Sequence, residues 1–177
     1  MISNKNITKK PTYFVEVGPL ISERFYSGIP NVVRRLVQEI LKLDLNIKFF
    51  HGMKTIQKDK ILKAVDKGSN KYIGKIEDII DKDLKEELEA IEGESYAIFT
   101  NVRHGVKKIF NKELHIVYDL TPRVTPEFHH EDTVRFYDES YEGEYSKADF
   151  LVCISEATKN DLLTYLPKID EGKWSGT

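Results

Sequence analysis

Three segments carry residues whose types could do chemistry, and two of them begin where an apolar run ends. Asp119 follows the run HIVY, and Ser155 and Glu156 follow the run FLVCI. Asp119 could accept hydrogen bonds from a hydroxyl-bearing ligand, and Ser155 or Glu156 could contact a ligand directly. In the third segment, Gly28 precedes the helix-like stretch IPNVVRRLVQEIL. Backbone N–H groups at such a helix start favour an anion, with phosphate as the obvious candidate.

The loop after Asp119 adds further polar groups. Arg123 could supply a cation, and His129 or His130 a group that titrates near neutral pH. Each residue also has an ordinary structural explanation. Asp119 could be a turn acceptor, Ser155 a helix cap, and the two histidines residues of an exposed loop. The residues alone leave both interpretations open.

The elements that must position these residues alternate between strands and helices. β-Branched and aromatic runs bounded by turn residues predict strands at 12–17, 45–50, 95–100, 113–120 and 149–155. Helical spacing predicts helices from Pro30 to about 43, over 76–91, over about 131–147 and over 156–166, with loops at 18–30 and 121–132. The alternation predicts an α/β fold, a Rossmann-like, mainly parallel sheet with helices on both faces. Ligands bind such sheets outside the carboxyl ends of the strands, where the three segments would converge.

Apolar spacing also predicts which helix faces are buried. The helix that starts at Pro30 would bury Val32, Val33, Leu36, Val37, Ile40, Leu41 and Leu43. The helix over 76–91 would bury Ile76, Ile79, Ile80, Leu84, Leu88 and Ile91, and its charge run would form a solvated face.

Composition excludes several classes of protein. The 177 residues include 27 basic and 29 acidic residues, a net charge of −2, so nucleic acid is not the expected partner. The single cysteine, Cys153, cannot form an intramolecular disulfide and is expected to be a buried core thiol. Cys and His show no metal-ligand spacing, the N-terminus lacks a signal core, and no apolar run could span a bilayer. The sequence therefore predicts a cytoplasmic protein without a metal.

The predicted strands and helices also indicate the domain organisation. Residues 1–11 are expected to be a flexible leader and residues 12–168 one Rossmann-like domain. Residues 169–177 would form a tail beyond that domain.

The three segments together resemble a known family. YSGIPNVVRRLVQEIL resembles the glycine loop and first helix of the family 4 (group 1) glycosyltransferases, and VYDLTPRVTPEFH resembles their His-Asp-Leu-x-Pro segment. YSKADFLVCISEATKNDLLTYL resembles their Ala-Asp-x-apolar-x-(Val/Ile)-Ser-Glu-x-Thr-x-x-Asp-Leu signature. The order and spacing of these matches cover residues 12–166.

The resemblance implies a GT-B architecture, in which two Rossmann-like domains face each other across a cleft. The N-terminal domain mainly holds the acceptor, and the C-terminal domain binds the nucleotide sugar through a pair of glutamates. This sequence ends at KIDEGKWSGT, before any second βαβ series. We therefore expect an acceptor-binding half that is inactive alone and is completed by a C-terminal donor domain or a partner subunit.

The implied reaction is transfer of a sugar from a nucleotide diphosphate sugar to a glycan or lipid-linked acceptor, with retention of configuration and without a cofactor. Asp119 would line the acceptor pocket as the catalytic position, and Gly28 would approach the diphosphate. Ser155 and Glu156 would stand at the cleft floor, and Arg123 would bind substrate. Polysaccharide biosynthesis and peripheral contact with the inner face of the cytoplasmic membrane are family-level expectations.

The sequence departs from the family pattern at one position. Tyr118 stands where many relatives have a histidine near the donor sugar. Tyrosine can donate a hydrogen bond but does not titrate near pH 7. His104, in NVRHGVK, is the alternative source of an imidazole in the cleft.

Two other function classes stay open at this stage. The chain could be a non-catalytic binding or assembly module that pairs with a partner chain, or with itself, through its exposed cleft face. It could also be a flavodoxin-like or other nucleotide-binding domain, because the fold alone permits that.

Overall fold

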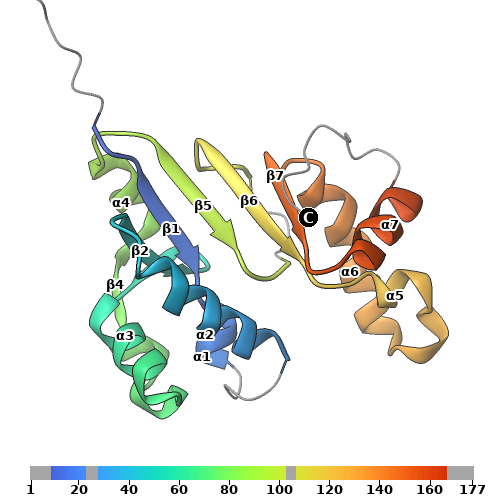
Figure 1. Ribbon diagram of the computed structural model, residues 1–177, viewed down its shortest axis with the longest axis horizontal. Coiled ribbons are helices and arrows are strands. Elements are labelled where there is room, and N and C mark those ends of the chain that lie inside the picture. The colour runs from blue at the N-terminus through green and yellow to red at the C-terminus, as the bar shows by residue number, and fades with distance from the viewer. Residues whose placement is uncertain (1–8, 23–27, 103–106, 167–177) are drawn as a thin grey trace, which may run out of the picture. The chain divides into compact units, whose positions relative to one another are not determined.

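The computed structural model describes residues 9–22, 28–102 and 107–166. The chain has an α/β fold, in which seven strands are ordered β4-β3-β2-β1-β5-β6-β7 in a mostly parallel sheet flanked by helices (Figure 1). This confirms the predicted fold class. The chain divides into two compact units, an N-terminal unit of residues 1–96 and a C-terminal unit of residues 97–177.

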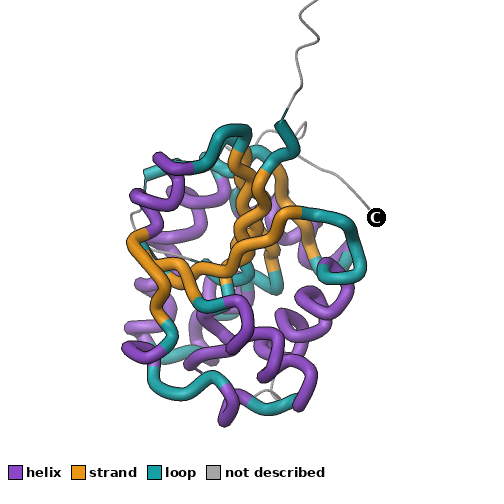
Figure 2. The backbone as a smooth tube through the Cα atoms, turned by 90° about the vertical axis from the view of Figure 1, so that its left-hand side faces the viewer, coloured by secondary structure: helices purple, strands orange, loops and turns teal. Residues whose placement is uncertain are grey.

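The N-terminal unit contains four complete strands. They are β1 (Thr12–Glu16), β2 (Asn46–His51), β3 (Lys54–Ile56) and β4 (Ile80–Asp83). β1 and β2 are parallel, whereas β3 runs antiparallel to both β2 and β4. The helices are α1 (Gly18–Ser22), α2 (Gly28–Ile40), α3 (Lys58–Lys67) and α4 (Leu84–Ala90), with 3-10 turns η1 (Asn70–Tyr72) and η2 (Ile76–Asp78). Figure 2 colours the helices of the chain purple and its strands orange.

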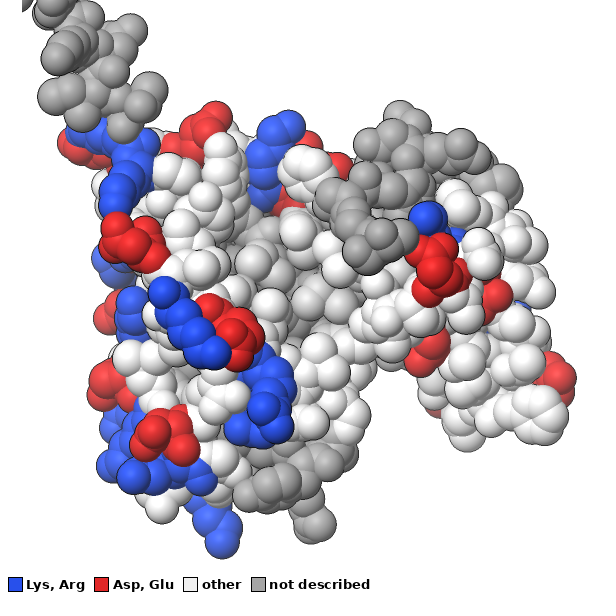
Figure 3. Space-filling view, in the orientation of Figure 1, with Lys and Arg blue, Asp and Glu red and all other residues white. Residues whose placement is uncertain are grey.

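Apolar side chains from the strands and helices of the N-terminal unit form its core. Nearly all of their surface is removed from water, as for Phe14, Val15, Val33, Phe49, Ile61 and Leu84. Glu87 is also buried, and it forms ion pairs with Lys48 and Lys82 that compensate its charge. On the face shown in Figure 3, the lysines and arginines of this unit are interspersed with acidic side chains, so no large field of one sign covers it.

The C-terminal unit is built on the parallel strands β6 (Lys112–Val117) and β7 (Phe150–Cys153). Strand β5 (Ser95–Phe99) spans the division between the units. The helices are α5 (Thr121–Val124), α6 (Glu131–Tyr145) and α7 (Glu156–Tyr165), with a 3-10 turn η3 (Pro126–Phe128). The core gathers Val117, Leu120, Tyr141, Tyr145, Ala148, Leu151, Leu162 and Leu166.

Most of the predicted elements are confirmed within a few residues, but three predictions were wrong. Residues 18–22 form the short helix α1 instead of a loop, and residues 121–132 contain α5 and η3. The single helix predicted over 76–91 is replaced by η2, β4 and α4. Its interruption has a physical cause, because Ile80 and Asp83 pair with β3 and the Asp83 carboxylate caps α4 at Lys85 N, 2.9 Å away.

The predicted buried faces need smaller corrections. Val33, Val37 and Ile40 of α2 are buried as predicted, whereas Val32 is 40% exposed. Leu43 is 56% exposed because α2 ends at Ile40. Cys153 is only partly buried against the C-terminal core. None of the helices in the described residues is long and apolar enough to cross a membrane.

Candidate functional site

The carboxyl ends of β6 and β7 bring two of the three predicted segments together within the C-terminal unit. Val117 and Cys153 are paired in the parallel register, and Ile154 N donates to Val117 O over 3.1 Å. The residues that follow each strand, Tyr118 and Ser155 onward, therefore start from neighbouring positions. Parallel strands end at the same edge of a sheet, which is where α/β proteins bind ligands.

A chain of hydroxyl groups connects the two segments. Thr158 Oγ1 donates to the backbone oxygen of Tyr118 over 3.0 Å and lies 3.0 Å from Ser155 Oγ. Since the single Thr158 hydroxyl proton is given to Tyr118, the Ser155 hydroxyl donates to Thr158 Oγ1. Ser155 Oγ in turn accepts from Thr158 N over 3.1 Å. The start of α7 is thereby fixed to the end of β6.

Ser155 is thus the N-cap of α7, the ordinary structural explanation that its sequence position allowed. Its backbone is extended, with φ of −157°, and its hydroxyl both donates and accepts within the cap. The neighbouring Glu156 is exposed and forms a 3.6 Å ion pair with Lys159 one turn along the helix. Of these two residues, Glu156 has the side chain that is more accessible to a ligand.

Asp119 combines a structural role with an open carboxylate oxygen. Its Oδ1 accepts from Thr121 N at 3.0 Å and from Thr121 Oγ1 at 2.8 Å, which fixes the turn into α5. Within the described residues, its Oδ2 forms no hydrogen bond or ion pair, and the residue is exposed. One oxygen therefore holds the turn, while the other is available to accept from a ligand hydroxyl.

The Asp119 backbone is held from the opposite side by helix α6. Tyr141 donates its hydroxyl proton to Asp119 O over 3.1 Å. Burial, together with the nearby Asp119 charge, raises the pKa of Tyr141 far above its usual range. Tyr141 therefore stays a proton donor at any physiological pH. Tyr137, Tyr141 and Tyr145 pack in succession along α6, with ring centroids 5.1 and 5.5 Å apart.

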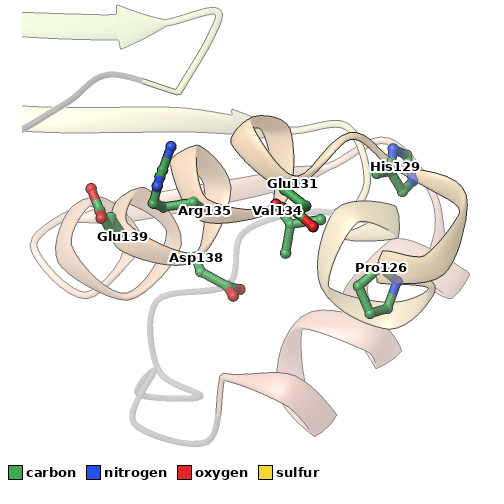
Figure 4. A pocket seen from close by; sticks show the side chains of 7 residues that line it. All are labelled: Pro126, His129, Glu131, Val134, Arg135, Asp138 and Glu139. Carbon is green, nitrogen blue, oxygen red and sulfur yellow. The ribbon is translucent and has the colours of Figure 1, made fainter.

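Arg123 is partly buried, and its guanidinium is 3.3 Å from Asp138 Oδ1 on α6. This contact connects α5 to α6 and takes up part of the positive charge that Arg123 could offer to a substrate. Asp138 also lines a shallow pocket of about 420 Å³ between η3 and α6 (Figure 4). The pocket is lined by Pro126, His129, Glu131, Val134, Arg135, Asp138 and Glu139.

Sequence reasoning identified only His129 among the polar residues of this pocket. Glu131, Asp138 and Glu139 add three carboxylates opposite one guanidinium from Arg135. Their spacing of seven and eight residues from Glu131 places them along one face of α6, which is the signal that could have revealed them. Carboxylates gathered in an open pocket can accept hydrogen bonds from a polyhydroxyl ligand.

The remaining candidates lie elsewhere. Gly28 is the first residue of α2, in the N-terminal unit, with φ of +30°, and among the described residues no non-neighbouring atom lies within 4 Å of an added Cβ. That backbone angle explains the glycine, and the open space is compatible with close approach of a ligand. Tyr118, which precedes Asp119 in the chain, is partly buried, and His104 lies outside the described residues.

No group of three or more His, Cys, Asp or Glu side chains in the described residues could hold a metal ion. Comparisons of the chain with protein-family models, with curated proteins and with solved structures found no match. The functional assignment therefore depends on the geometry of the site and on the sequence motifs.

Proposed function

We propose that this chain is the acceptor-binding domain of a retaining glycosyltransferase. In this proposal it holds a glycan or lipid-linked acceptor while a donor domain or partner subunit supplies the nucleotide diphosphate sugar. The supporting observation is the junction of β6 and β7, where the Asp119 and Ser155–Glu156 segments lie side by side with one Asp119 oxygen open. The motif order described above supports the same assignment.

The chemistry assigned to these residues is positioning of an acceptor hydroxyl. Asp119 Oδ2 accepts the hydroxyl proton in a hydrogen bond and aims its oxygen at the anomeric carbon of the donor sugar. A new glycosidic bond forms there as the bond to the diphosphate breaks, and the hydroxyl proton passes to an oxygen of the departing diphosphate. Such a reaction needs both substrates held in one geometry, so the chain is inactive without its donor-binding partner.

Substitution of Asp119 by asparagine tests the proposal in the completed enzyme. Asn keeps an oxygen that can accept from Thr121, so the turn is retained while the negative charge is lost. A hydrogen bond to a charged group contributes about 1.5–3 kcal/mol, so we expect turnover to fall about 10- to 100-fold. The assay screens nucleotide diphosphate sugars and measures the nucleoside diphosphate released.

Asp66→Asn is the matched control, because Asp66 is an exposed aspartate of α3 in the N-terminal unit. Its turnover should equal that of the wild type. If Asp119→Asn and Asp66→Asn are equally active, Asp119 does not position the acceptor. If no nucleotide sugar is consumed by the completed enzyme, the glycosyltransferase assignment is wrong.

A second candidate is a non-catalytic assembly module, which the exposed apolar residues of the C-terminal unit favour. Phe128 is 80% exposed and Ile154 is 57% exposed. Burial of such side chains in an interface is favourable, at about 25 cal/mol per Å² of apolar surface. Sedimentation of the purified chain distinguishes the candidates, since an assembly module that pairs with itself should dimerise and Phe128→Ser should weaken the dimer.

A further inference from the structure

A carboxylate and an imidazole meet at the ends of β1 and β2 in the N-terminal unit. Glu16 is the last residue of β1, and His51 is the last residue of the parallel strand β2. The Nδ1 atom of His51 lies 3.2 Å from Glu16 Oε1. The same oxygen accepts a 2.6 Å hydrogen bond from Gly18 N. This pair belongs to neither of the segments assigned to the acceptor site.

The local backbone explains why the two side chains meet. Glu16 is paired with Phe50 in the strand register, and Val17 N donates to Phe50 O over 2.9 Å, so the two strand ends are held together. Gly18 makes room for the pair. A Cβ at residue 18 would lie 2.4 Å from Glu16 Oε1 and 2.5 Å from His51 Nδ1, so any other residue would push the pair apart.

The contacts fix the proton on one nitrogen of the His51 ring. Because Glu16 Oε1 accepts from Gly18 N–H, it acts as an acceptor toward His51 as well, and Nδ1 carries the hydrogen. Glu16 is almost completely buried, whereas the His51 side chain is 44% exposed. Within the described residues, Glu16 is the only group bonded to the imidazole. The outer nitrogen, Nε2, is therefore the atom that a ligand would reach.

The surrounding charges select the class of ligand. A histidine ring can be neutral or protonated, and the hydrogen bond to Glu16 raises the pKa of His51 above its ordinary value. Lys54, the β3 residue paired with His51, directs its ammonium to Asp83, 3.2 Å away. The Glu16 charge disfavours an anion beside the ring. A hydroxyl group fits both states, since it can donate to neutral Nε2 and accept from protonated Nε2–H.

We propose that Glu16 and His51 form a proton-transfer site, in which His51 Nε2 exchanges a proton with a hydroxyl group of a bound ligand. The O–H bond of the ligand breaks as the Nε2–H bond forms, which leaves an imidazolium and an alkoxide. The reverse step returns the proton. Glu16 positions the ring and stabilises its charge without taking the proton. All of these residues lie in the N-terminal unit, so the inference does not depend on the proposed function.

The first measurement is ¹⁵N NMR of the histidine side chains across a pH titration of the full chain, with His51→Gln used to assign the signal. Neutral His51 should carry its proton on Nδ1. In Glu16→Gln the pKa of His51 should fall, and in Glu16→Asp it should move back toward the wild-type value. A merely structural Glu16 would leave both signatures unchanged. Neutral His51 with its proton on Nε2 would overturn the proposal.

The second measurement uses diethyl pyrocarbonate, which acylates neutral imidazole. Nε2 attacks a carbonyl carbon, ethyl carbonate leaves and decomposes to carbon dioxide and ethanol, and mass spectrometry locates the adduct. His130 is the internal control, because its side chain is 78% exposed. Molar glycerol, as a hydroxyl probe, should slow the acylation of His51 relative to His130, and inorganic phosphate should not. Protection by phosphate, or an equal effect of glycerol on both histidines, refutes a hydroxyl site.

Discussion

Substitution of Thr158 by valine tests whether its hydroxyl holds the two segments of the candidate site together. Valine has nearly the same shape, so the packing of α7 is retained while the hydroxyl is lost. Thr158 is 6% exposed, and loss of its hydroxyl removes its 3.0 Å contacts with the Tyr118 carbonyl and with the Ser155 hydroxyl. A hydrogen bond contributes about 0.5–1.5 kcal/mol net, and two are removed, so we expect a loss of about 1–2 kcal/mol in unfolding free energy.

Urea unfolding followed by circular dichroism measures this loss. If the unfolding free energy falls by about 2 kcal/mol per M of urea, the urea concentration at the unfolding midpoint should fall by about 0.5–1 M. Thr164→Val is the matched control, because Thr164 lies on the same helix but is exposed, and its hydroxyl donates only to Asn160 O over 2.7 Å. That variant should stay within about 0.5 kcal/mol of the wild type. Equal midpoints for the two variants would show that the Thr158 bridge does not stabilise the junction.

Three further predictions address other parts of the chain. Gly18→Ala should lower the unfolding free energy by about 1–3 kcal/mol, because the added Cβ overpacks against Glu16 and His51. Gly143→Ala, whose Cβ would meet open space, should raise the unfolding free energy by about 0.5–1 kcal/mol in the same urea assay. Burial raises the pKa of Cys153 to about 11, so iodoacetamide at pH 8 should alkylate the native chain on the order of 100-fold more slowly than the urea-unfolded chain. The pKa of His51 is higher in the folded chain than in the unfolded chain, so its protonation stabilises the fold below the unfolded pKa, and this stabilisation is lost as pH rises through the folded pKa. His51→Gln should therefore lower the unfolding free energy more at about pH 5 than at about pH 9.

The elements that sequence reasoning predicted well are those whose local signals agree. Helix α7 has a serine cap, a helical apolar pattern and a proline just beyond its end, and it runs from Glu156 to Tyr165, one residue short of the prediction. Strand β7 lies within the apolar run FLVCI. In both cases the local preference and the tertiary packing favour the same structure, so a short window of sequence is enough.

The region over 76–91 failed because tertiary pairing overrides its helical spacing. The isoleucines and leucines there recur at helical intervals, but Ile80 pairs with Ile56 across an antiparallel ladder. Strand β3 itself is only three residues long, which is too short for an alternation signal. Its existence depends on the turn after His51 and on β4, and neither is visible in a local window.

The candidate site shows the same division between local and long-range information. Asp119 and Ser155 were identifiable because each directly follows an apolar strand. The Glu16–His51 pair was missed because its members are 35 residues apart and meet only through the parallel register of β1 and β2. One signal was present in the sequence: Glu16 and Asp119 are each the next-to-last residue of a predicted strand, His51 directly follows one, and glycine lies two residues after Glu16.

Glu16 and Asp119 share a local geometry. Each carboxylate directs one oxygen to the backbone N–H two residues further on, Gly18 N in one case and Thr121 N in the other. The hydrogen bond to the backbone restricts rotation of the side chain before any ligand binds, so binding loses less side-chain conformational entropy. The same contact caps α4 at Asp83, so this geometry serves a turn as well as a ligand site. In the two proposals, the carboxylates at the end of β1 and after β6 are therefore preorganised, and the atom left to the ligand is His51 Nε2 in one unit and Asp119 Oδ2 in the other.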